Sequence, residues 1–161
     1  MPLIVTSLTL LAVGALFGAS LYDAIVLAPN LRGGPEGLEH GRLFMRRATP
    51  ANLFRVAAPI TQLLLLVAVI ACWATPSCRW PLAGALVLLV ANDAMTFAFH
   101  YPRLRLMFTA PLTVAAGTLE AAAREWTSAN RLRVALVLAA WVCTWFATMR
   151  LAQGWRSWPL A

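Results

Sequence analysis

Lysine is absent from this chain of 161 residues, so all 13 of its basic side chains are arginine. Charged residues make up 12% of the sequence, about half their usual share in a soluble domain, and hydrophobic residues make up 61%. Such a chain has too few polar side chains to cover its surface in water. The composition therefore excludes a disordered chain, a coiled coil and a DNA-binding module, and we expect no nucleic-acid partner despite the net charge of +7.

Histidine and cysteine are also scarce, with two and three residues. The sequence has no Gly-rich phosphate loop, Ser-His-Asp order or nucleophile elbow. Glu36, Glu39 and His40 lie close together, but their spacing matches neither a di-iron bundle nor a zinc peptidase, and a solvated helix face explains them. His100 has no second histidine at membrane depth for haem ligation. The sequence therefore supports neither a metal nor a haem cofactor.

Four apolar segments are long enough to cross about 30 Å of hydrocarbon, which takes about 20 helical residues. They cover residues of about 3–28, 54–74, 81–100 and 132–151, and each ends at a proline, a charge or both. The first segment lacks the basic start of a signal peptide, so we expect it to be retained. We predict an all-α fold, an integral membrane four-helix bundle formed as a single domain by residues 1–161.

Arginine is distributed unevenly along the chain. Ten of the 13 lie in the first-to-second and third-to-fourth connections, and three lie toward the opposite end of the predicted bundle. Because positive side chains favour the cytoplasmic side, we expect both long connections in the cytoplasm and both termini outside, in a bacterial-type inner or plasma membrane. Tryptophans favour interfaces, and four fall at the predicted outer interface, namely Trp73, Trp80, Trp155 and Trp158.

Both long connections are expected to contain short interfacial helices on the cytoplasmic side. Pro35 followed by Glu36 is typical of a helix start, and the basic, partly apolar stretch from there to Ala48 suits a membrane surface. In the later connection, apolar residues recur at helical spacing, and this helix is expected to continue into the fourth span. These residues are Leu112, Ala115, Leu119, Ala122 and Trp126.

Polar residues inside the spans are costly in hydrocarbon and indicate either a functional site or contacts that hold helices together. Polar or aromatic residues of all four spans have a common predicted depth of about 8–11 Å from the cytoplasmic face. Residues next to them in the sequence are included in the same set. The set consists of Tyr22, Asp23, Gln62, Asn92, Asp93 and Trp141. We expect it to line a ligand-binding site in the cytoplasmic half of the bundle. Interhelical polar contacts without a ligand are the alternative.

The third span adds a direction to this site. Asp93, Thr96 or Phe97, and His100 follow helical spacing and share one face of a regular α-helix. If that face points inward, a polar track leads from the cytoplasmic interface to the interior.

Two pairs of small residues have spacings that suggest specific contacts. Gly14 and Gly18 have the GxxxG spacing of closely packed helices. Cys72 and Cys78 flank the turn that is expected on the outside. The sequence allows either a disulfide between them or two free thiols.

Two stretches carry a family resemblance. Residues 125–133 (EWTSANRLR) precede the fourth span, and residues 18–23 (GASLYD) lead to the first-span ending at 28–30 (APN). With the long basic first connection, they resemble the anthrone oxygenase-like family of small four-span membrane proteins, the DUF1772 group. The resemblance implies oxygenation of an electron-rich, anthrone-type polyphenol to a quinone, without a dedicated metal or flavin.

The same stretch provides candidate site residues. Trp126, Asn130 and Arg133 lie at i, i+4 and i+7, so they share one helical face at the cytoplasmic mouth. A ring, an amide and a permanent cation suit a planar phenolate, although Trp and Arg also anchor helix ends at interfaces. In the enzyme hypothesis Asp93 removes a proton, Asn130 and Arg133 stabilise the anion, and His100 ends the polar track.

Two classes of function stay open at this point. One is a membrane oxidoreductase acting on a flat apolar phenol or quinone. The other is a non-catalytic lipid- or quinone-binding module, or a small transporter or partner subunit. In both, the expected partners are the lipid bilayer and a small apolar aromatic ligand, and a homo-oligomer stays open.

Overall fold

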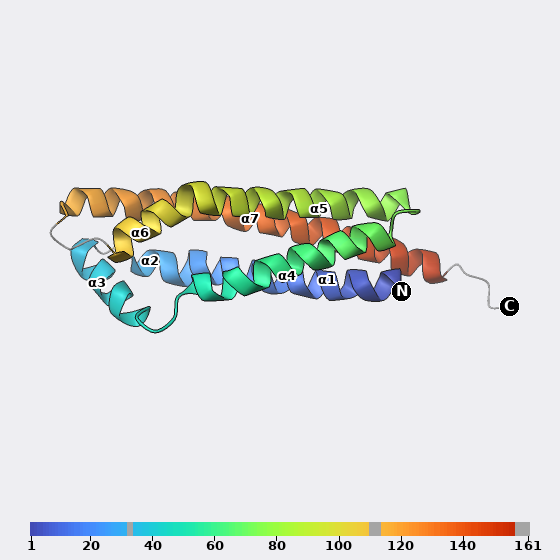
Figure 1. The fold of residues 1–161 in the computed structure, drawn as a ribbon, viewed down its shortest axis with the longest axis horizontal. Coiled ribbons are helices and arrows are strands. Elements are labelled where there is room, and N and C mark those ends of the chain that lie inside the picture. Colours follow the sequence, from blue (N-terminus) through green and yellow to red (C-terminus); the bar gives the residue numbers. More distant parts are fainter. Residues whose placement is uncertain (32–33, 110–113, 157–161) are drawn as a thin grey trace.

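The computed structural model describes residues 1–31, 34–109 and 114–156. These residues form helices and no strands, which confirms the predicted all-α class. In chain order the elements are α1 (Pro2–Tyr22), η1 (Asp23–Leu27), α2 (Ala28–Asn30), α3 (Gly34–Phe44), α4 (Pro50–Ala71), α5 (Pro76–Met95), η2 (Thr96–His100), α6 (Tyr101–Thr109) and α7 (Ala116–Arg156). Elements η1 and η2 are π-helical turns that join their neighbours into longer helices (Figure 1).

Four of the described helical segments are long and apolar enough to cross a membrane, which classes the chain as an integral membrane protein. They are Pro2–Asn30, Pro50–Ala71, Pro76–Thr109 and Ala116–Gly154. Even the shortest has 22 residues, which is about 33 Å of helix against about 30 Å of hydrocarbon. The predicted number of spanning segments is therefore confirmed.

The observed helices do not share all the bounds of the predicted spans. α4 begins at Pro50 and not at 54, because proline in the first helical turn loses no hydrogen bond. Pro76 starts α5 in the same way, before the predicted start at 81. The predicted fourth span is the second half of α7, a continuous helix of 41 residues.

The helices expected in the two long connections are present. α3 starts at Gly34, one residue before Pro35, and ends at Phe44, before Ala48. α7 continues from the connection into the fourth span, and it buries Leu119, Ala122 and Trp126 as their spacing indicated. Leu112 belongs to the same predicted pattern and lies outside the described residues.

Each π-helical turn lies just before a proline. In both turns a backbone amide donates to the carbonyl five residues back instead of four. The wider turn leaves room for the ring of Pro29 or Pro102, which lacks the N–H of a regular α-helical bond. The third segment therefore does not stop before Pro102, as predicted, but continues to Thr109. Asp23 begins η1 and His100 ends η2, so both turns carry a candidate site residue.

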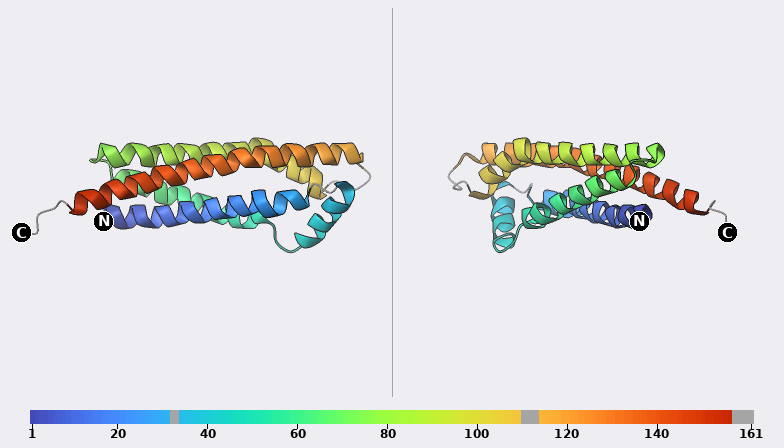
Figure 2. Two further views of the ribbon diagram at one scale, coloured as in Figure 1. Left: turned by 180° about the vertical axis from the view of Figure 1, so that it is seen from behind. Right: turned by 45° about the vertical axis from the view of Figure 1, so that its right-hand side comes forward.

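The spanning segments pack side by side. α1 contacts α4 and α7, and α5 contacts the same two helices. α3 and α6 lie at one end of the molecule, whereas Met1 and the end of α7 lie at the other (Figures 1 and 2). α3 packs on α6 and α7 at its end of the molecule.

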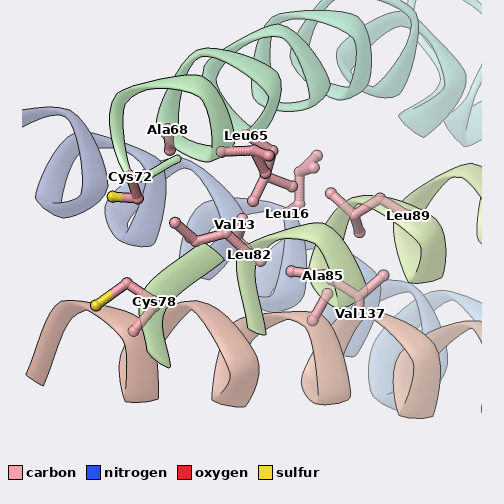
Figure 3. Packing of buried hydrophobic residues seen from close by; sticks show 13 residues of the cluster. Val13, Leu16, Leu65, Ala68, Cys72, Cys78, Leu82, Ala85, Leu89 and Val137 are labelled. Atoms are coloured by element: carbon pink, nitrogen blue, oxygen red, sulfur yellow. The ribbon is translucent and has the colours of Figure 1, made fainter. Parts of the chain in front are cut away.

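Buried apolar side chains form two clusters. The first includes Val13, Leu65, Leu82 and Val137, lies between the spanning helices and is shown in Figure 3. The second lies under α3 and α6, and its members are Ala28, Leu31, Leu38, Met107, Leu119, Ala122, Ala123 and Trp126. The candidate polar residues of the first, third and fourth spanning segments lie in the sequence between residues of the first apolar cluster and residues of the second.

The cysteines are free thiols. Cys72 and Cys78 are both buried in the first apolar cluster and form no disulfide (Figure 3). Burial, reinforced by the neighbouring Cys78 thiol, raises the pKa of the Cys72 thiol above its ordinary value. Both side chains therefore act as small apolar groups in the packing.

The two glycines of the GxxxG spacing differ in their surroundings. A Cβ atom on Gly14 would lie 3.1 Å from Nε1 of Trp141, whereas one on Gly18 would meet nothing within 4 Å. Only the first of these two glycines lies at a close helix–helix contact, where α1 meets α7.

Candidate functional site

A cavity of about 700 Å³ lies at the α3 and α6 end of the molecule. One wall comes from the start of α4 and the facing wall from η2 and α6, while η1 and α7 supply buried residues between them. The lining residues that define its chemistry are Asp23, Phe54, Arg55, His100, Trp126 and Arg133. We call this space the large cavity.

Buried polar atoms without a partner gather at the large cavity. His100 is fully buried, and within the described part of the chain neither of its ring nitrogens has a hydrogen-bond partner. Nε1 of Trp126 and Nε of Arg133 are also unpartnered, and the Trp126 ring meets His100 edge-on at 6.0 Å between centroids. Each unmet buried polar atom costs about 1–3 kcal/mol, so these atoms need partners, which water or a bound molecule in the large cavity would supply.

Arg133 is turned into the protein. Its side chain is 5% exposed, and its guanidinium carbon lies 5.2 Å from the centroid of the Phe54 ring. Its Nη1 donates to Oδ1 of Asn130 at 3.3 Å, one turn earlier on α7. Asn130 is itself fully buried and its Nδ2 has no partner among the described residues. An arginine that only anchored a helix end would extend toward headgroups, whereas this one points to an internal acceptor.

The charges around the large cavity are predominantly positive. Arg55, Arg105 and Arg133 line it, and Asp23 is the carboxylate among its lining residues. Asp23 is 4% exposed and faces the same space as Arg133. With the arginines and Asp23 ionised, the lining attracts a partly or fully negative oxygen.

A second, much smaller cavity lies deeper between the helices. It has room for about one water molecule, at about 10 Å³, and residues of all four spanning segments line it. Nε2 of Gln62 donates to Oδ2 of Asp93 at 2.7 Å, and Nδ2 of Asn92 donates to Oδ1 at 3.2 Å. Asp93 on α5 is therefore joined to α4 through the Gln62 amide, which is the geometry of an interhelical polar contact.

The polar track expected along the third span is divided by the structure. Asp93 lines the small cavity, whereas Thr96, Phe97 and His100 line the large one. A π turn adds one residue to the helix and so rotates everything after it by about 100°. The turn η2 lies between Asp93 and His100, so the two side chains no longer share a face.

Two predicted ligand-binding residues lie away from both cavities. Tyr22 is 50% exposed on the outside of its helix and lines neither space. Trp141 stacks on Phe17 with 6.2 Å between ring centroids and packs against the first apolar cluster. Trp141 was expected at the same membrane depth as Asp23. The residue of α7 that lines the large cavity with Asp23 is Arg133 instead.

Other functional residues were missed by sequence reasoning. Phe54 lines both cavities, and Arg55 and Arg105 line the large one. In the sequence these two arginines served only to predict the membrane orientation. An aromatic residue next to an arginine at the start of a span, as in Phe54–Arg55, could have indicated a binding site. Arg103 also joins α6 to α7 through a 2.6 Å ion pair with Glu125.

Comparison with models of protein families, with curated proteins and with solved structures gives no match for this chain. Among the residues that the structure describes, no three or more His, Cys, Asp and Glu side chains form a group that could hold a metal ion. The function is therefore argued from the geometry of the large cavity.

Proposed function

We propose that the protein is a transmembrane four-helix bundle with α3 and α6 at the cytoplasmic interface and both termini outside. The excess of arginine near α3 and α6 supports this orientation in a bacterial-type inner or plasma membrane. The large cavity then lies in the cytoplasmic half of the bundle.

We further propose that this cavity binds a planar, apolar phenol or quinone and that the protein is an oxidoreductase of the anthrone oxygenase-like kind. The observation that carries the proposal is the group of unpartnered polar atoms on His100, Trp126 and Arg133, set among apolar and aromatic side chains. A phenol or quinone oxygen would supply their missing partner, while its ring would contact Phe54 and Trp126.

The reaction proposed is the conversion of an anthrone to the corresponding quinone with molecular oxygen. For the parent compound, anthrone and O₂ give anthraquinone and water, so the ring methylene is oxidised to a carbonyl as O₂ is reduced. His100 is the proposed proton acceptor, because Asp93 lines the small cavity and is already bound to two amides. Arg133, held by Asn130, would stabilise the anthrone anion once the proton has left.

Turnover by the purified protein in lipid nanodiscs tests this function. We expect anthraquinone formation and O₂ uptake above the rate in empty nanodiscs. Arg133→Gln and His100→Gln should each lower the excess rate by about 100-fold or more, the scale of losing a catalytic acid–base or anion-stabilising group. Arg150→Gln, on the other half of the same helix, is the matched control and should keep the parent rate.

A non-catalytic quinone- or lipid-binding module is the second candidate. The arginine-rich lining favours it, since an anionic amphiphile would be held there without any chemistry. Saturable binding of a quinone by a protein that leaves the anthrone rate unchanged would select this candidate and exclude the enzyme.

A further inference from the structure

The large cavity opens between α4 and the η2–α6 segment, where the lining residues Arg55, Phe97 and Arg105 are exposed. Its lining residues on α4 run from Pro50 to Arg55, and those on the facing segment run from Thr96 to Thr109. These two stretches lie at the same end of the molecule and diverge there, whereas α4 packs on α5 closer to the turn that joins them (Figure 1). The His100 side is fully buried, but Phe97 at the edge is 65% exposed.

The residues at the edge of this opening change from charged to apolar along the helices. Arg55 and Arg105 are exposed lining residues and belong to the arginine-rich end. Phe97 lies in the uncharged stretch 94–99 of the third span, where a spanning helix meets hydrocarbon. The cavity thus passes from cationic side chains at the arginine-rich end to an apolar edge farther along the third spanning segment.

We propose that the ligand of this site is a membrane-resident phenol or quinone that carries a long apolar chain. Its ring enters from the bilayer between α4 and η2 and binds to His100, Trp126 and Arg133, while its chain leaves past Phe97 into the lipid. This inference rests on the proposed function and names the substrate class of the same site. A volume of about 700 Å³ is in the range of sites for drug-sized ligands, so the first part of a chain fits beside the ring.

Charge and exposure support an amphiphile over a ring without a chain. A free polyphenol needs contact with water to enter and leave, whereas an opening with an exposed phenylalanine at hydrocarbon depth serves a ligand already dissolved in the membrane. Arg55 and Arg105, at the arginine-rich end of the opening, would hold the polar head of such a ligand at headgroup depth.

Equilibrium binding in nanodiscs tests the inference with two probes that share one ring. Duroquinone has no chain, and the second probe is the same trimethylquinone ring with a decyl chain in place of one methyl group. After correction for partitioning into empty nanodiscs, the parent protein should bind the decyl compound about tenfold or more tightly than duroquinone, a difference of one decade in Kd.

Two matched variants on the third span locate the chain. Phe97→Ser should weaken binding of the decyl compound about tenfold and of duroquinone less than twofold. Val87→Ser changes an equally exposed residue, 66% against 65%, that does not line the cavity, and it should alter neither affinity. Thermal unfolding of both variants checks that they are folded to the same extent.

The outcomes separate the two proposals. If both probes bind with equal affinity and Phe97→Ser affects neither, the inference is overturned and the proposed function stands. If neither probe binds at a saturable site, the proposed function is overturned together with the inference. If Phe97→Ser changes the oligomeric state and not the affinity, a second copy of the chain covers the opening and the inference is again overturned.

Discussion

Arg133 is the single residue on which the proposal of a binding site in the large cavity depends most. Burying a guanidinium is expensive unless hydrogen bonds and a counter-charge compensate for its lost hydration. Asn130 accepts one of its hydrogen bonds and Phe54 lies near its face, but Nε has no partner in the described part of the chain. In the proposed function, an oxygen atom of the bound ligand accepts the missing hydrogen bond of Nε.

Asp93 has a different role, which a double-mutant cycle will measure. Asp93→Ala leaves the amide of Gln62 without its 2.7 Å acceptor, and we expect a loss of about 1–3 kcal/mol of unfolding free energy. Gln62→Ala should cost less, and the coupling between the two should be about 1 kcal/mol. Reversible unfolding of the four proteins in mixed micelles gives these values. Additive effects, or a loss of quinone binding without loss of stability, would contradict the structural role.

At the scale of elements, the π turns explain how the site is assembled. Each replaces a regular turn before a proline, and each brings a polar residue, Asp23 or His100, to the large cavity. The same rotation carries Asp93 away from His100 and toward α4. Two helices that would otherwise break at proline thus continue and present polar groups in directions that a regular helix would not allow.

The contact between α1 and α7 gives a paired prediction. Gly14→Ala would place a methyl group 3.1 Å from the Trp141 ring and should lower the unfolding free energy by about 1–2 kcal/mol through overpacking. Gly18→Ala meets no atom within 4 Å and should be neutral or stabilise the helix by up to about 1 kcal/mol. Thermal melting in detergent compares the two. Equal effects would mean that the close approach at Gly14 does not exist.

The sequence was sufficient for the spans and for part of the site. Apolar length and arginine placement predicted four spanning segments, and the shared depth of Gln62 and Asp93 matches the hydrogen bond that joins them. Pro102 was read as a helix end, because a proline signals a break unless a wider turn absorbs it. Whether such a turn forms depends on packing against α7, so local sequence could not predict where His100 points.

At the scale of the whole molecule, the arrangement makes a prediction about membrane sidedness. With the native cysteines replaced, a single cysteine at Gln153 should react with a membrane-impermeant maleimide on intact cells. One at Ala48 should react only after the cells are permeabilised, because three spanning segments lie between the two positions and place them on opposite sides. The reverse pattern would invert the orientation, and reaction of both on intact cells would contradict the arrangement of the spans.

The position of the large cavity distinguishes the two ends of the molecule. It lies at the arginine-rich end, opens between two spanning segments and contains most of the unpartnered polar atoms named above. The apolar cluster toward the other end, shown in Figure 3, packs the spanning helices against one another. The main apolar packing and the large cavity thus lie toward different ends of the molecule.

The most direct test is an equilibrium titration with 1-hydroxyanthraquinone, a planar and coloured phenol–quinone, in nanodiscs. The protein should show one saturable site per chain. Arg133→Gln should weaken it about 10- to 100-fold, as expected for the loss of a charged hydrogen bond, and Arg150→Gln should leave it unchanged. Absence of saturable binding, or equal affinity in the parent and Arg133→Gln, would contradict the assignment of the large cavity as a phenol- or quinone-binding site.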